Sequence, residues 1–382
     1  MTRFMKADQF FFPDGLKTGG FLEVTDGIFG QWQSQVPDDA EVLDYSGYKI
    51  APGLVDTHIH GYADCDVMDC SSEGILKMSQ ALLETGVTSF LPTTLTSSSE
   101  ALTKAAESIA QVAGTETGAK IQGIYFEGPY FTEEYKGAQN EAYMSDPSLE
   151  EFAGWQKAAK GLIKKIALAP EREGVTDFVS ALKEQGVTVA LGHSNATYAQ
   201  AKSAVEAGAS VWVHVYNGMR GLSHRELGMV GSAFHIPNTY AEWICDGHHS
   251  LPEAGDILMK QKGYDHVALI TDCMRAGGCP DGDYRLGEFP VTVGNGTARL
   301  KDSGNLAGSV LKLKDGLKNV INWSLASPEE AIKMASLVPA ISVGIDDVCG
   351  QIKEGYAADF IVLDKDFELV ATYLDGEKAW EC

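Results

Sequence analysis

The stretch Ala51-Pro52-Gly53-Leu54-Val55-Asp56-Thr57-His58-Ile59-His60-Gly61 is the most informative part of the sequence, because an apolar strand pattern ends here in two histidines and a glycine. Side chains two positions apart on a β-strand point to the same face, so His58 and His60 would present two imidazoles together. Such a pair is also common as the polar end of a strand. The motif therefore indicates a metal site only in combination with further ligands.

Beyond this stretch, apolar strand-like runs alternate with amphipathic helical stretches, which is typical of βα units around a parallel sheet. Eight strands are predicted, at residues 54–60, 88–94, 121–127, 165–170, 188–193, 210–216, 240–246 and 267–272. They predict an α/β fold with a TIM-type (β/α)8 barrel, whose active site lies at the carboxyl ends of the strands. A doubly wound open sheet is the competing topology. The barrel is favoured because polar residues end so many different strands.

Both ends of the chain have a different pattern, with short β-like runs and no long helix. We expect residues 1–50 and 345–382 to pair in one small β-sandwich domain, into which the catalytic barrel of residues 51–344 is inserted. Within the barrel, residues 277–308 are rich in glycine, and Ser327-Pro328 is a helix start of the usual kind, a cap residue followed by proline.

The composition narrows the class of protein. A net charge of −23 argues against nucleic acid or an anionic membrane surface as the main partner. No apolar run approaches the roughly 18 residues of a membrane span, and we expect a cytoplasmic protein. The seven cysteines include no CxxC pair, which favours reduced thiols over disulfides or a cysteine zinc site.

Residues able to bind metal or act as a base recur at the predicted carboxyl ends of the strands. They are His58, His60, Glu127, His193, His214 and Asp272. Imidazole and carboxylate ligands together suit zinc, iron, manganese or a similar divalent ion. A barrel would bring these residues to one rim, so the sequence predicts a metal site there.

The sequence segments around these residues resemble those of the N-acetylglucosamine-6-phosphate deacetylases of the amidohydrolase superfamily. The HxH pair and the final aspartate are shared widely in the superfamily, whereas the other segments are specific to fewer of its members. The resemblance covers essentially the whole chain and is carried by PGLVDTHIHG at 52–61, FEGPY at 126–130, LGHSNAT at 191–197, HVYNGM at 214–219, CDGHH at 245–249 and ITD at 270–272.

The resemblance implies a hydrolase that removes the N-acetyl group from N-acetyl-D-glucosamine 6-phosphate, giving acetate and glucosamine 6-phosphate. Glu127, His193 and His214 would hold the principal metal. His58 and His60 would bind a second ion, with Glu127 able to bridge, so one or two ions are expected per subunit. A metal-activated water would be the nucleophile and Asp272 the general acid/base.

The resemblance also implies substrate contacts and a homodimer. Arg225 would reach the active site of the neighbouring subunit, and Arg220 is the alternative phosphate partner. The purely structural alternative for Arg225 is an ion pair with Glu226 or another acid. Some relatives have a histidine at the position of Gln139. The expected substrate contacts are Ala138, Gln139, Asn217, Gly218, Arg225, Asp246, His249, Leu306, Ala307 and Gly308.

Two other functions remain open on the sequence. One keeps the metal site but changes the substrate, to the galactosamine epimer or a cyclic amide. The other is a non-catalytic sugar-phosphate sensor, which would not require both a complete ligand set and Asp272.

Overall fold

The computed structural model describes all 382 residues, and its centre is a barrel of eight parallel strands, as predicted. The barrel strands are β6 (Leu54–Ile59), β9 (Val87–Thr94), β11 (Ile124–Glu127), β12 (Ile163–Leu168), β13 (Thr188–Leu191), β14 (Val211–Trp212), β15 (Tyr240–Trp243) and β16 (Val267–Leu269). They pair in this order, with β10 (Lys120–Ile121) beside β9. A parallel bridge between Ile59 and Cys273 joins the first strand to the last, so the open-sheet alternative is wrong.

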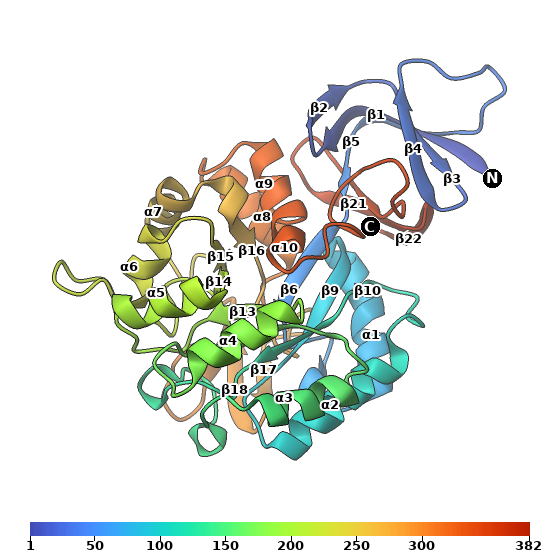
Figure 1. Ribbon diagram of the computed structural model, residues 1–382. Coiled ribbons are helices and arrows are strands. Elements are labelled where there is room, and N and C mark those ends of the chain that lie inside the picture. Colours follow the sequence, from blue (N-terminus) through green and yellow to red (C-terminus); the bar gives the residue numbers. More distant parts are fainter.

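Helices surround the barrel (Figure 1). Those after the strands are α1 (Ser72–Leu82), α2 (Ser99–Val112), α3 (Leu149–Ala158), α4 (Val175–Glu184), α5 (Tyr198–Ala207), α6 (Gly228–His235), α7 (Pro252–Lys262), α8 (Leu313–Asn322), α9 (Pro328–Met334) and α10 (Leu337–Ser342). Helix α4 buries Val175, Phe178, Val179 and Leu182, the residues at helical spacing. Helix α9 begins after Ser327 with a capping box, as the sequence predicts.

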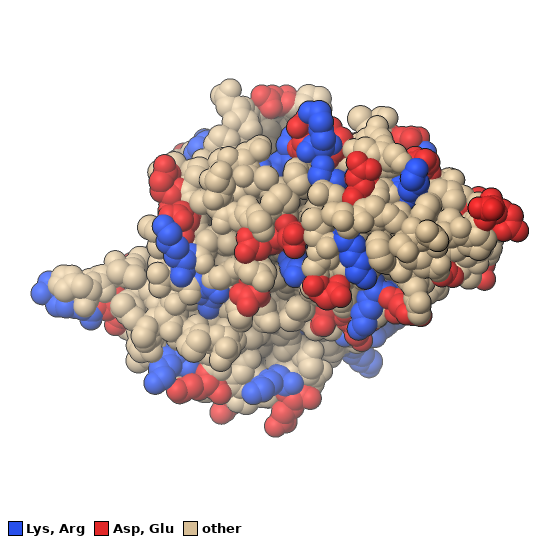
Figure 2. Space-filling view, turned by 90° about the horizontal axis from the view of Figure 1, so that it is seen from above, with Lys and Arg blue, Asp and Glu red and all other residues tan.

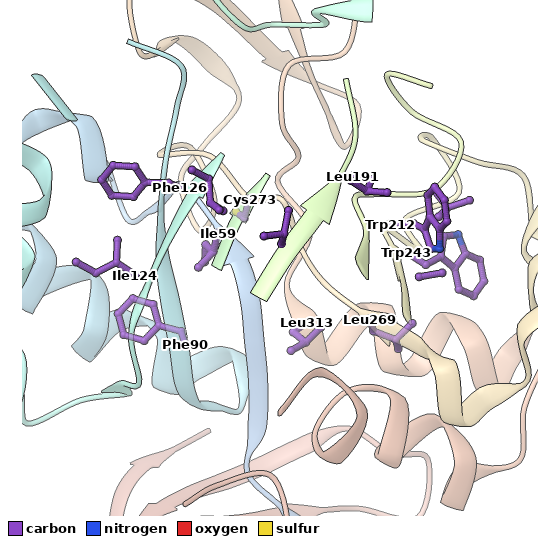
Figure 3. Packing of buried hydrophobic residues seen from close by; sticks show 14 of the residues in the cluster. Ile59, Phe90, Ile124, Phe126, Leu191, Trp212, Trp243, Leu269, Cys273 and Leu313 are labelled. Atoms are coloured by element: carbon purple, nitrogen blue, oxygen red, sulfur yellow. The ribbon is translucent and has the colours of Figure 1, made fainter. Parts of the chain in front are cut away.

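The main core lies between these helices and the strands. Figure 3 shows side chains from opposite sides of the barrel wall, including Phe126 from β11, Trp212 from β14 and Trp243 from β15. All three are buried. Burial of each large aromatic contributes about 3 kcal/mol, so this layer fixes the positions of the strand ends that carry the site.

Strands from both ends of the chain form one eight-stranded sheet outside the barrel, as expected (Figure 1). It contains β1 (Thr2–Phe12), β2 (Gly15–Thr18), β3 (Phe21–Thr25), β4 (Ile28–Gln33), β5 (Val42–Pro52), β20 (Phe360–Leu363), β21 (Leu369–Leu374) and β22 (Glu377–Glu381). The two ends meet where β5 pairs with β20 in antiparallel register, Pro52 opposite Phe360. Strand β5 continues through Gly53 into β6, and His58 and His60 lie at the other end of β6, away from this junction.

The glycine-rich segment contains a three-stranded antiparallel sheet that the sequence did not reveal: β17 (Gly282–Leu286), β18 (Phe289–Gly294) and β19 (Thr297–Leu300). Its apolar side chains pack on Leu95 and Met274 at the barrel rim. Short elements complete the chain: β7 (Gly61–Tyr62), β8 (Cys65–Asp66), η1 (Val67–Asp69), η2 (Leu83–Thr85), η3 (Glu133–Tyr135), η4 (Glu141–Tyr143) and η5 (Tyr264–His266).

Surface and thiol features agree with the composition. All seven cysteines are free, as predicted. None of the helices combines the length and the apolar character needed to traverse a lipid bilayer. Figure 2 shows acidic and basic side chains interspersed over one face, with no large basic area that would attract nucleic acid.

Candidate active site

Six of the predicted residues meet at the carboxyl ends of the barrel strands. They form two groups that could each hold a metal ion, His58 with His60 and Asp272, and Glu127 with His193 and His214. Within each group, one ligand atom per residue lies within 4.8 Å of the others, and every member is buried. The barrel thus brings together residues that are up to 214 positions apart in the sequence, from His58 to Asp272.

Glu127 stands between the two groups. Its Oε1 lies 3.3 Å from Nε2 of both His193 and His214, and 3.4 Å from Nε2 of His58. Its Oε2 lies 3.2 Å from Nε2 of His60. One carboxylate therefore faces both groups, which is the arrangement of a bridging ligand.

Three site residues have left-handed backbone conformations, with φ of 45° at His193, 30° at His214 and 50° at Asp272. Such angles are uncommon for residues with a side chain and cost about 1–3 kcal/mol each. The surrounding hydrogen bonds hold them: the Asp272 amide donates to the His58 carbonyl at 2.9 Å, and the Ser309 amide donates to the Asp272 carbonyl at 2.7 Å. The strain turns these side chains from the strand ends towards the barrel mouth.

Three of the four histidines are fixed through Nδ1. His60 and His193 contact the backbone carbonyls of Thr93 and Tyr135, at 3.2 Å and 2.9 Å. His58 contacts the carboxylate of Glu242 at 3.0 Å instead, and Glu242 in turn forms an ion pair with the fully buried Lys165. In each case Nε2 remains the ring nitrogen that faces the neighbouring ligands.

Glu242 and Lys165 were missed by the sequence reasoning. Both lie in predicted strands whose other residues are mostly apolar, so a charged residue inside a buried strand was the available signal.

The electrostatics of the site favour a cation. Burial lowers the pKa of His58, but the charges of Glu242, Glu127 and Asp272 outweigh it and raise that pKa to about 9. Burial raises the pKa of Glu127, but the neighbouring histidines hold it well below its usual range. The carboxylates thus stay charged and need positive charge beside them.

The donor set fits one or two divalent ions. Nε2 of His58 is fully buried and has no hydrogen-bond partner, although carboxylate oxygens of Glu127 and Asp272 lie 3.4 Å from it. An unpaired buried nitrogen costs about 1–3 kcal/mol unless something binds it. Nitrogen and oxygen donors without thiolate are the set expected for zinc, iron or manganese.

A cavity opens over these groups. Of the expected substrate contacts, Ala138, Gln139, Asn217, Gly218, His249, Leu306 and Gly308 line it, beside Leu95, Gly137 and Leu286, which the sequence reasoning did not select. Ala307 is buried with the core of the small sheet and does not line the cavity. Asp246 also lies outside the lining, but its Oδ2 is 2.6 Å from Nδ1 of His249 and fixes that ring.

Two residues in the cavity wall have defined orientations. Gln139 accepts a hydrogen bond from the Thr96 amide at 2.8 Å and donates from Nε2 to Oε2 of Glu127 at 2.6 Å. The Asn217 amide donates to the His214 carbonyl at 2.9 Å, whereas the Gly218 amide has no acceptor within the protein. Gly218 is therefore the member of the pair whose amide is free for a substrate.

Arg225 is not near the cavity of its own chain. It is exposed on the loop of residues 213–227 that precedes α6 and projects from the barrel (Figure 1). It forms no ion pair, and Glu226 instead accepts from the backbone amides of Tyr198 and Gly228. The purely structural explanation, an Arg225–Glu226 ion pair, is thus wrong. Arg220, the alternative phosphate partner, donates to the Asn195 carbonyl at 3.3 Å and also lies outside the cavity lining.

Comparisons with known proteins agree with this site. The sequence model of the Amidohydrolase family matches residues 50–379. N-acetylglucosamine-6-phosphate deacetylase from Vibrio furnissii is 40% identical over 90% of this chain and 86% of its own length. N-acetylgalactosamine-6-phosphate deacetylase from Escherichia coli O157:H7 is 36% identical over 99% of this chain and 100% of its own length.

A solved structure is similar over almost the whole chain. It is a mutant of N-acetyl-D-glucosamine-6-phosphate deacetylase from Mycobacterium smegmatis, in which an aspartate is replaced by alanine, in complex with N-acetyl-D-glucosamine-6-phosphate. It superposes with a TM-score of 0.94 at 27% identity and covers 99% of both chains.

Proposed function

The chain belongs to the amidohydrolase family, and we propose that it is a metal-dependent hydrolase that removes the N-acetyl group from N-acetyl-D-glucosamine 6-phosphate, giving glucosamine 6-phosphate and acetate. The observation that carries the proposal is the convergence of six candidate ligands on one cavity: Glu127, His193, His214, His60 and Asp272 line it, and His58 lies buried against them.

Each residue of the site has a proposed part. Glu127, His193 and His214 would hold the principal ion, and His58 and His60 would hold a second one with Asp272 in the same group. A divalent ion bound there supplies Lewis acidity for a carbonyl oxygen and lowers the pKa of water.

Asp272 is the proposed general acid/base. Its Oδ1 lies 3.1 Å from Nε2 of His60, at the edge of the cavity, where it can accept the proton of an attacking water. When the C–N bond breaks, the same carboxyl group returns a proton to the departing amine. The attacking water is the nucleophile, so the protein does not need to provide one.

The cavity wall provides the proposed substrate contacts. Gln139 keeps one N–H bound to Glu127, and its second N–H can polarise the acetyl oxygen from the cavity side. The free amide of Gly218 and Nε2 of His249 can bind sugar or phosphate oxygens. Ala138, Leu306 and Gly308 complete the wall, with Asp246 and Ala307 supporting it from behind.

A phosphate dianion requires a strong cation, and no lysine or arginine lines the cavity of the single chain. Arg225 is exposed on a projecting loop and has no acidic partner, which supports a homodimer in which this arginine enters the neighbouring active site. In that assembly the local positive charge offsets the overall charge of −23 at close range. Action on a sugar phosphate also agrees with a cytoplasmic enzyme.

The test is acetate release by purified protein with N-acetylglucosamine 6-phosphate, before and after removal of metal by a chelator. We expect activity to disappear on chelation and to return when zinc, iron or manganese is added. Full activity of the metal-free protein would contradict the mechanism.

The galactosamine epimer is a second candidate substrate, because an N-acetylgalactosamine-6-phosphate deacetylase matches this chain over its full length. Comparison of kcat/KM for the two epimers decides between them. The sugar without phosphate should be a poor substrate of either enzyme, and equal turnover of it would refute the role of Arg225.

A further inference from the structure

A charged pair lies inside the barrel directly beneath the HxH motif. The Glu242 side chain is 1% exposed and that of Lys165 is fully buried, and the two form an ion pair between β15 and β12. Oε2 of Glu242 also lies 3.0 Å from Nδ1 of His58, which comes from β6 on another part of the barrel wall. Three strands thus contribute to one buried contact chain that ends at a predicted metal ligand.

This contact determines which nitrogen of His58 carries the proton. An ionised carboxylate can only accept hydrogen bonds, so Nδ1 must donate. In the neutral ring the hydrogen is therefore on Nδ1, and Nε2, which faces Glu127 and Asp272 at 3.4 Å from each, is the nitrogen left to bind an ion. That is the form of imidazole that binds a metal ion.

Among the four histidines of the two candidate metal groups, His58 is the one with a charged acceptor behind it. His60 and His193 contact backbone carbonyls instead, and Nδ1 of His214 has no partner. A carboxylate acceptor makes the imidazole a stronger base, and therefore a stronger ligand, than a neutral carbonyl does. The Oε2 atom of Glu242 also accepts from the backbone amide of His214 at 3.3 Å, so Glu242 contacts both ligand groups.

Stability alone is a weak reason for this arrangement. A buried ion pair is often no more stabilising than apolar side chains of similar volume, because both charges lose their hydration. Lys165 also lies 3.8 Å from the centre of the Tyr125 ring, so its position is tightly defined. A costly pair aimed at a metal ligand is better explained by an effect on that ligand.

We propose that Glu242 is a positioning residue for the ion of the His58, His60 and Asp272 group, with Lys165 as the partner that holds its carboxylate in place. Glu242 holds the His58 ring with Nε2 towards the ion and so determines whether this second ion is bound at working metal concentrations. The inference rests on the proposed metal-dependent function, but its test measures zinc binding without substrate, so the two can fail separately.

The experiment titrates zinc into the metal-free full-length protein and counts bound ions per chain. Glu242→Gln alone would leave Lys165 buried without a partner, so the main variant is the double substitution Glu242→Gln with Lys165→Met. We expect wild type to bind two ions, and the double variant to bind the first as wild type does and the second 10- to 100-fold more weakly. Wild-type affinity for both ions in the double variant, or a single ion in wild type, would overturn the proposal.

A matched control is Asp359→Asn. Asp359 is also buried and paired with a lysine, Lys120, but it lies at the junction with the terminal β-sheet. Zinc binding by this variant should equal that of wild type. If it weakens the second ion as much as the double variant does, the effect is a general loss of stability and the proposal is wrong.

A measurement on the unmodified protein covers the case in which the double variant does not fold. Nitrogen-15 NMR of histidine side chains in the zinc-loaded wild type reports which ring nitrogen carries hydrogen, with the His58 signal identified by its loss in His58→Gln. We expect hydrogen on Nδ1 and metal at Nε2. Hydrogen on Nε2, or metal at Nδ1, would overturn the proposal.

Discussion

Replacing Gly218 by alanine should damage the metal site far more than the fold. Gly218 has φ of +60°, and a Cβ added there would lie 2.8 Å from Nδ1 of His193 and 3.3 Å from the Tyr135 carbonyl oxygen. Ordinary contacts of a Cβ begin at 3.4 Å, so the His193 ring would have to shift by about 0.6 Å. The ring is hydrogen-bonded to Tyr135 at 2.9 Å and cannot move without weakening that bond.

The expected magnitudes follow from this displacement. Metal–ligand distances vary by only about 0.2 Å between good sites, so a shift three times larger should weaken the ion held with Glu127 and His214 about 10- to 100-fold. Catalysis should fall by about 100-fold, because reacting groups misplaced by less than 1 Å lose much of their advantage. Because Gly218 has a left-handed backbone, alanine there should also lower the unfolding free energy by about 1–2 kcal/mol.

Two control variants separate these effects. Gly186 has φ of +71° and no atom within 4 Å of an added Cβ, so Gly186→Ala has the backbone cost without the collision. The second control is Gly221→Ala. Gly221 lies on the same loop as Gly218, its φ is not positive, and an added Cβ would meet no atom within 4 Å. The assays are zinc content after loading, acetate release, and unfolding in urea. If zinc content and turnover of Gly218→Ala were within twofold of those of Gly186→Ala, the predicted displacement of the His193 ring would be wrong.

Three further substitutions test other parts of the site and fold. Asp272→Asn should lower kcat by about 10²- to 10⁴-fold because the proton acceptor is lost. Substrate binding, measured by calorimetric titration, should persist. Turnover within tenfold of wild type would exclude the general-base role. Alanine at both His58 and His60 should lower the number of zinc ions bound per chain, measured by elemental analysis, more than it lowers turnover, and an unchanged ion count would show that this pair is not a metal site. Burial lowers the pKa of Lys262 from 10.5 to about 8, so between these values the unfolded chain binds a proton that the folded chain has released. The unfolding free energy should therefore rise with pH over that window relative to Lys262→Met, and identical pH profiles of the two proteins would contradict the shift.

Much of the fold could be predicted because its signals are local. The spacing of Val175, Phe178, Val179 and Leu182 specifies a helix with one buried face, and Ser327-Pro328 specifies where another begins. All eight barrel strands appear where apolar runs were found, some shorter than predicted. The three strands within residues 277–308 were missed: their side chains do alternate between more exposed and more buried, but each run has only four to six residues and glycines separate the runs.

The ligands of the candidate site could also be selected, since each stands at the end of a predicted strand. Their supporting residues could not. Glu242 gives no sign in the sequence that it faces His58, because that contact crosses the barrel between strands 184 residues apart. The same is true of Asp246, expected as a substrate contact and found holding His249 instead, and of Arg225, which lies outside the cavity of its own chain.

The sequence predicts the element types, their order and the candidate metal ligands, because backbone preference and hydrophobic periodicity act over a few neighbouring residues. The resemblance already implied two groups with Glu127 able to bridge them, whereas the tertiary structure alone shows that Asp272 joins the group of His58 and His60. The tertiary structure also decided that Gly218 rather than Asn217 offers a free amide. These contacts depend on closure of the barrel, in which the bridge between Ile59 and Cys273 joins the first strand to the last. The position of each side chain at the rim therefore depends on the packing of all the strands between them.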